Sequence, residues 1–206
     1  MSTRGYRQYC GFARALDVVG ERWSLLIVRN LLLGGQRFGE LRKGLPGVAS
    51  NMLTERLKKL VEHEVVSHID GVYALTELGR GLEPAVFALA DWGERNLMGP
   101  PREEDRVLVR YAMTSMRRKI KPSAREARVE FDIDGDVFSL VCGPEPDVVQ
   151  GACPGASLRV RADVAGALGF FFRGAPLKEW SVGEGISLSG DASALEVLRG
   201  SLSGDV

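Results

Sequence analysis

Apolar side chains recur at helical spacing along the first third of the chain. Phe12, Leu16 and Val19 lie four and three positions apart, which predicts one face of a helix. Residues 23–33 are almost all apolar, and a run of about 11 such residues predicts a buried helix at the centre of a small core. Gly34-Gly35 should end it, because glycine adopts the left-handed conformation of a helix C-terminus at little cost.

Two shorter helical patterns follow. Residues 38–43 predict one helix, residues 44–47 a turn, and a second helix should begin with Ser50 as its N-cap and end near residue 63. The apolar stripe of this second helix is formed by Leu53, Leu57, Leu60 and Val61. Polar and basic residues occupy its other faces, which is typical of a helix-turn-helix DNA reader. No glycine follows, and a left-handed Glu64 would cost about 1 kcal/mol.

A hairpin signal comes directly after this helix. Asp70-Gly71 separates the β-prone runs 65–69 and 72–75, which predicts a type I′ turn and therefore a wing. Thr76 should cap a further helix that continues to about residue 97, with Pro84 kinking or splitting it. That helix carries more apolar surface than a small winged helix can cover, so we expect the same helix of a second subunit to cover it.

The second half of the chain changes character. Turn and charged residues at 98–105 predict a boundary between domains 1–99 and 100–206. A helix from about 106 to 118 should precede strands at 129–133, 137–142, 157–162 and 186–189, with a hairpin at Asp134-Gly135. Further helices are expected at 163–172, 177–182 and 192–202. The predicted fold is an α-rich winged helix-turn-helix domain followed by an α+β domain with a mainly antiparallel sheet.

Charge is distributed unevenly, although the 206-residue chain has a net charge of zero. Residues 1–63 hold eleven Lys or Arg against five Asp or Glu, whereas residues 101–206 hold fourteen against sixteen. A basic first half indicates that only this half faces phosphate. No apolar run is long enough to span a bilayer and no signal-peptide core precedes the first helix, so we expect a cytoplasmic protein without a membrane partner.

These residues resemble the HxlR-type family of bacterial transcriptional regulators over roughly the first half of the chain. The resemblance is carried by Cys10, Trp92 and the segments ALDVVGERW (15–23), RFGEL (37–41), LTERL (53–57) and YALTELG (73–79). It implies a homodimeric winged helix, paired through its terminal helices, on an inverted-repeat operator in double-stranded DNA. Family wings are usually longer and often basic, whereas this one has no Lys or Arg between residues 65 and 76.

The second half resembles a sterol-carrier-protein type 2 domain more loosely. The matching features are Gly151 and the segments LRVR (158–161), FFFRG (170–174) and GISLSGD (185–191). Domains of that family enclose a hydrophobic tunnel for lipid-like ligands, so the resemblance implies an apolar small-molecule effector. The residues expected to line such a cavity are Leu168, Phe171, Phe172, Trp180, Ile186 and Leu188. The alternative for the aromatic run at residues 170–172 is ordinary core packing.

DNA contact is assigned to the helix-turn-helix. Asn51 and Arg56 can make bidentate contacts with adenine and guanine edges, respectively. A second set should mostly hold phosphates and set the register on the duplex. It comprises Arg37, Arg42, Lys43, Ser50, Thr54, Lys58 and Lys59.

Other chemistry is sparse. Cys10 precedes the first helix, where the helix dipole and nearby arginines could favour a thiolate, so it is a redox candidate; the alternative is an unreactive structural thiol. The sequence contains no catalytic motif and no metal-ligand spacing, and we expect neither an enzyme nor a cofactor. The rival to a DNA-binding regulator is a carrier of lipid or other apolar molecules whose first half serves dimerisation.

Overall fold

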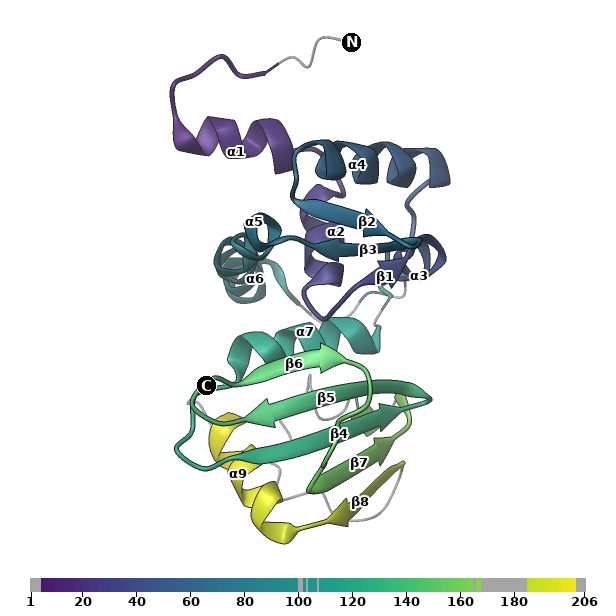
Figure 1. The fold of residues 1–206 in the computed structure, drawn as a ribbon, viewed down its shortest axis with the longest axis vertical. Helices are drawn as coiled ribbons and strands as arrows, with labels where there is room; N and C mark the ends of the chain where they lie inside the picture. The colour runs from purple at the N-terminus through teal and green to yellow at the C-terminus, as the bar shows by residue number, and fades with distance from the viewer. Residues whose placement is uncertain are drawn as a thin grey trace. The chain divides into compact units, whose positions relative to one another are not determined.

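The chain forms two compact units, residues 1–106 and 107–206 (Figure 1). The structure is a computed structural model that describes residues 5–99, 102, 104–106, 108–164, 166–167 and 185–202. The domain boundary after residue 99 and the roles assigned to the two halves stay predictions. No helix in the described ranges has both the length and the apolar character needed to cross a membrane.

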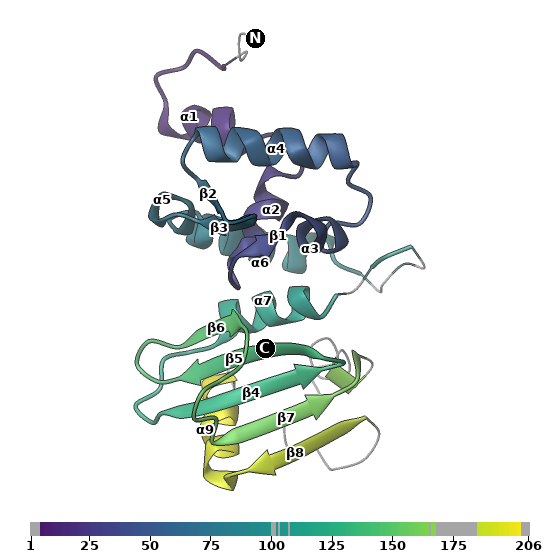
Figure 2. The same cartoon turned by 45° about the vertical axis from the view of Figure 1, so that its right-hand side comes forward.

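Unit 1 is a winged helix-turn-helix (Figures 1 and 2). Its small antiparallel sheet has the strand order β1-β3-β2. The predicted split of the last helix is confirmed, because Pro84 lies in the first turn of α6 and the chain breaks before it. The elements are α1 (Gly11–Val19), α2 (Ser24–Leu31), β1 (Gln36–Arg37), α3 (Phe38–Lys43), α4 (Ser50–Glu62), β2 (Val66–Ile69), β3 (Val72–Leu75), α5 (Glu77–Arg80) and α6 (Glu83–Leu97).

The core of unit 1 joins α2 to α4. Ile27 and Leu31 on α2 pack with the α4 stripe Leu53, Leu57 and Leu60, and each of these five side chains is at most 1% exposed. The spacing of four and three residues places the α4 leucines on one side of the helix. That side is therefore fixed against the core, and the opposite side faces solvent.

The end of α4 is held by backbone hydrogen bonds. The N–H of Val65 donates to the Leu60 carbonyl over 2.9 Å and the N–H of Glu64 to the Val61 carbonyl over 3.0 Å, a Schellman motif. Glu64 has φ +57°, so the left-handed conformation considered at this position is confirmed. Ser50 as N-cap is wrong: Ala49 caps α4, and Ser50 is its first helical residue.

The wing is closed as expected. Asp70 and Gly71 have φ +51° and +76°, which confirms a turn with both central residues at positive φ. Thr76 caps α5, since its hydroxyl accepts a hydrogen bond from the Gly79 N–H over 3.1 Å. The same hydroxyl donates to the Glu64 carbonyl over 2.5 Å, which ties the start of α5 to the end of α4.

Unit 2 is a five-stranded sheet with helices. The strand order is β6-β5-β4-β7-β8, and α9 packs against β4, β5 and β7 while α7 packs against β6 (Figure 1). The elements are α7 (Val109–Lys119), β4 (Ala127–Ile133), β5 (Asp136–Cys142), β6 (Asp147–Gln150), β7 (Leu158–Ala162), β8 (Ile186–Gly190) and α9 (Ala192–Leu202). Strand β6 was not predicted. The predicted helices at 163–172 and 177–182 fall largely or wholly outside the described residues.

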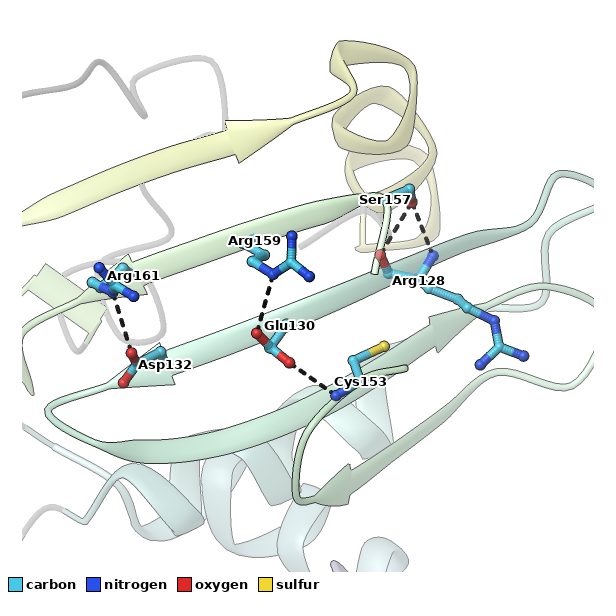
Figure 3. Close-up of polar contacts among 7 residues, drawn as sticks. All are labelled: Arg128, Glu130, Asp132, Cys153, Ser157, Arg159 and Arg161. Atoms are coloured by element: carbon cyan, nitrogen blue, oxygen red, sulfur yellow. Dashed lines mark hydrogen bonds and ion pairs between the residues drawn. The ribbon is translucent and has the colours of Figure 1, made fainter. Parts of the chain in front are cut away.

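The sheet is mainly antiparallel, as predicted, with one parallel pair, β4 and β7. On one face of this pair, neighbouring residues have opposite charge (Figure 3). Arg159 Nε lies 3.3 Å from Glu130 Oε1, and Arg161 Nε lies 3.2 Å from Asp132 Oδ2. Cross-strand pairs of this kind contribute roughly 0.2–1 kcal/mol each, which favours this register over a shifted one.

Replacing Gly79 by alanine should destabilise unit 1 by at least about 3 kcal/mol, because overpacking against backbone cannot be relieved by a side-chain movement. A Cβ at this position would lie 2.0 Å from the Val65 carbonyl oxygen. Urea denaturation of wild type and variant measures the difference. Gly39→Ala on α3 is the matched control: its Cβ meets no atom within 4 Å, so it should stabilise by roughly 0.5–1 kcal/mol. Equal midpoints for Gly79→Ala and wild type would contradict the close approach.

Replacing Glu64 by glycine should stabilise unit 1 by up to about 1 kcal/mol, because glycine adopts the left-handed conformation without a steric cost. Glu64→Ala keeps a Cβ at φ +57° and should show no such gain. Thermal and urea unfolding of both variants test this difference. A glycine variant no more stable than the alanine variant would show that Glu64 is not strained.

Candidate nucleic-acid interface

The solvent-facing side of α4 is polar. Asn51, Thr54, Glu55 and Lys58 are exposed along it. This side is opposite the buried leucine stripe, so its direction is fixed by the packing of α4 against α2. A helix that is held on its apolar side and free on its polar side can enter a major groove.

Helix α3 adds cations beside the start of α4. Arg42 and Lys43 are exposed in its last turn, where positive charge interacts favourably with the helix dipole. Arg42 Nη1 donates to Ser50 Oγ over 3.2 Å, which connects the two helices of the motif across their turn. Asn30 Nδ2 on α2 donates to the Gly44 carbonyl over 2.9 Å and anchors the beginning of that turn.

The structure places the predicted contact residues in three environments. Lys59 is half-buried and Arg56 is buried. The others are exposed, namely Arg37, Arg42, Lys43, Ser50, Asn51, Thr54 and Lys58. Their contact with DNA stays a prediction, but exposure is what such contact requires.

Two of the exposed side chains make local hydrogen bonds within α4. Thr54 Oγ1 donates to the Ser50 carbonyl over 2.9 Å, and Asn51 Oδ1 accepts from the Met52 N–H over 2.9 Å. The Asn51 amide therefore accepts through its oxygen at the helix N-terminus. A bidentate contact with adenine would require this side chain to exchange that bond for one with the base.

Arg56 does not lie where a base-reading side chain would have to lie, so the assignment made from its position in the sequence needs correction. It is 8% exposed, and its Nη2 lies 3.1 Å from Glu21 Oε2 in the turn between α1 and α2. The residue type alone placed it on the polar face, because arginine is mostly exposed. The buried side of α4 is wider than the row of leucines, and Arg56 lies on the flank of that row.

The wing receives a guanidinium from outside the hairpin. Arg37 on β1 pairs with Val72 of β3, and its Nη1 lies 3.5 Å from the Asp70 carbonyl at the tip of the wing. Its backbone N–H donates to Glu40 Oε2 over 2.6 Å at the start of α3. The wing lacks its own Lys or Arg, but Arg37 supplies a cation beside its turn. No local sequence pattern shows this contact, because it depends on the pairing of residue 37 with the wing.

Cys10 is exposed and directly precedes α1, as expected from the sequence. Cys142 and Cys153 are buried, and burial raises the pKa of the Cys142 thiol. Redox activity of Cys10 stays a prediction. The described residues contain no group of three or more His, Cys, Asp or Glu side chains placed to hold a metal ion.

The ligand cavity expected in the second half is only partly described. Leu168, Phe171, Phe172 and Trp180 lie outside the described residues, and Leu188 is half-buried in β8. Ile186 lines an open cleft of about 580 Å³. The cleft's other lining residues are mostly polar, charged or small: Asp132, Asp134, Gly135, Arg161, Ala162, Asp163, Gly185 and Ser187. An apolar effector stays a prediction that this cleft does not support.

Comparison with known proteins identifies the first unit. Residues 18–100 match the family described as HxlR-like helix-turn-helix. The regulator YdeP of Bacillus subtilis, named as an uncharacterized HTH-type transcriptional regulator, is 36% identical over 93 residues, which are 42% of this chain and 73% of YdeP. The chain belongs to the HxlR-like family. Regulator Mb3122 of Mycobacterium bovis is 41% identical over 98 residues, 43% of this chain and 61% of that protein.

Two solved structures similar to this HxlR-like chain each cover less than half of it. Quinone-bound YodB from B. subtilis is 33% identical, with a TM-score of 0.39, and the match covers 41% of this chain and 96% of YodB. The oxidized form of the redox regulator HypR is 34% identical, with a TM-score of 0.39, and covers 44% of this chain and 100% of HypR. The curated relatives that we compared are named as transcriptional regulators rather than enzymes.

Proposed function

We propose that this HxlR-like protein is a sequence-specific DNA-binding transcriptional regulator that acts as a homodimer on an inverted repeat. The observation that carries the proposal is the exposed polar face of α4, held in place by its buried leucine stripe. Family membership and the regulator names of its relatives support the same function. The basic charge of the first 63 residues provides the attraction to phosphate.

Base recognition is assigned to the first two turns of α4, where Asn51 and Thr54 are exposed. Phosphate contact is assigned to the exposed cations around them, Arg37, Arg42, Lys43 and Lys58. Phosphate contacts set the register on the duplex, and base contacts choose the sequence. Because the wing itself has no Lys or Arg, Arg37 is the group that would reach phosphate on the wing side.

Dimerisation is supported by the apolar surface that unit 1 leaves open. On α6, Leu89, Trp92 and Leu97 are 54%, 52% and 70% exposed. Near the N-terminus, Tyr9 and Phe12 are also fully or largely exposed. Exposed apolar side chains on α6 and near the N-terminus are suited to protein contact, and a second copy of this chain would bring two recognition helices to one operator.

DNA binding can be tested with duplexes selected from a random pool by the purified protein. Asn51→Ala should lose discrimination at one base pair, by about 1–3 kcal/mol, because a bidentate base contact carries that much. Lys58→Ala should weaken binding to all duplexes alike. It should also reduce the slope of log K against the logarithm of salt concentration by about one. A wild-type protein that shows no sequence preference at physiological salt would contradict the proposed function.

The dimer can be tested by analytical ultracentrifugation. Trp92→Glu and Leu97→Glu should each weaken self-association by about 100-fold or more, because a buried charge would replace a central apolar contact. Ile69→Glu is the matched control, since Ile69 is a 68% exposed apolar residue at the wing and should leave the mass unchanged. Association of the α6 variants equal to that of wild type would place the interface elsewhere.

A further inference from the structure

We infer that Arg56 is a positioning residue for DNA recognition. It sets the roll of α4 about its own axis through Glu21 and touches neither base nor phosphate. The inference rests on the proposed function and adds to it a residue that determines specificity from the inner side of the recognition helix.

Arg56 is buried on the inner side of α4. The Arg56 side chain is 9% exposed, and its Nη2 lies 3.1 Å from Glu21 Oε2. Its Nε and Nη1 are buried without a hydrogen-bond partner among the described residues. A guanidinium in this environment cannot reach a groove without leaving the core, and moving it would leave Glu21 unpaired.

The turn that holds Glu21 has a constrained backbone. A Cβ on the preceding Gly20 would lie 2.5 Å from the Leu16 carbonyl oxygen, so this position is suited to glycine. Trp23 has φ +81°, an unusual conformation for a bulky residue that persists only where its surroundings determine it. The Ser24 N–H donates to the Glu21 carbonyl over 3.1 Å and closes the turn. Glu21 therefore projects from a constrained backbone.

The position of Arg56 on α4 bears on the roll of the helix about its axis. The leucine stripe of α4 fixes one side of the helix, but apolar packing has no direction and allows a small roll about the axis. Arg56 follows Leu53 by three residues and precedes Leu60 by four, so it projects about 60° and 40° around the helix from these two leucines, on the flank of the stripe. An ion pair on that flank, to a carboxylate carried by a constrained turn, opposes the roll because the roll would separate the two charges. The same contact therefore sets the orientation of Asn51 and Thr54, because they belong to the same helix.

A purely stabilising role is a poor explanation of this pair. Burying a guanidinium with two unpartnered nitrogens costs desolvation energy, and an ion pair to a half-exposed carboxylate is worth little in return. A methionine of similar length would fill the space without that cost. The pair is therefore better explained by the orientation it imposes than by the stability it contributes.

The test compares binding of the full-length variants to the duplex selected by wild type and to every single-base-pair substitution of it. For Arg56→Met we expect discrimination to fall at several base pairs read by α4, by about tenfold in summed specificity. The salt dependence should stay at the wild-type value, because no phosphate contact is removed. Glu21→Gln should give the same pattern, and Arg56→Lys should restore only part of the discrimination, since an ammonium lacks the planar fork.

Lys58→Met is the matched control, because it removes an exposed cation, 75% exposed, from the same helix. It should weaken binding to all duplexes alike and reduce the slope of log K against the logarithm of salt concentration by about one. A loss confined to one base pair in Arg56→Met would make Arg56 a base reader and overturn the inference. Unchanged discrimination, or a reduced salt dependence, would overturn it equally.

Thermal unfolding of each variant separates folding from recognition. If Arg56→Met does not fold, Glu21→Gln decides, because it removes the carboxylate's charge from a half-exposed position and leaves Arg56 in place. Wild-type discrimination in a folded Glu21→Gln protein would overturn the inference. A wild-type protein that selects no sequence would instead overturn the proposed function, and this inference with it.

Discussion

The packing of the α4 leucines against α2 is the constraint on which the rest of unit 1 depends. Burial of this stripe determines which side chains of α4 face solvent and which face inward. It also fixes where the helix ends, since Val65 follows the stripe into the core and its N–H closes the Schellman motif with Leu60. The wing begins at once after that residue, so its position follows from the same packing.

Directional contacts surround this apolar core and refine it. Asn30 reaches the turn between α3 and α4, Arg42 reaches Ser50, and Arg37 reaches the tip of the wing. Each of these bonds joins elements that the leucine packing alone would leave free to shift by small amounts. Recognition of base edges depends on such small displacements, because hydrogen bonds weaken steeply with distance and angle.

Local patterns in the sequence were sufficient for most of unit 1. Asp70-Gly71 specified the wing turn, Thr76 the cap of α5, and the spacing of Leu53, Leu57 and Leu60 the buried side of α4. These features depend on backbone preference and helical periodicity, which a sequence displays directly. Arg56 was misjudged because its environment is set by Glu21, 35 positions earlier, and residue type alone predicts exposure.

In unit 2, local sequence patterns likewise fail to predict how whole strands pair. The alternation in β4 and β7 predicted two half-buried strands, but it carries no information about which strands pair or in which direction. The parallel pairing places Arg159 beside Glu130, a contact between residues far apart in the sequence (Figure 3). Strand β6 has only four residues with little alternation, so it lacked a pattern long enough to detect.

The close approach of Gly79 to the Val65 carbonyl also has a dynamic consequence. Thr76 bonds back to Glu64, and the Thr76 N–H donates to the same Val65 carbonyl over 3.2 Å. The two ends of the hairpin therefore lie together, where the last turn of α4 meets the first turn of α5. Opening of the hairpin at that point requires both helix ends to fray together, so the amide hydrogens of β2 and β3 should exchange with solvent as a single cooperative unit.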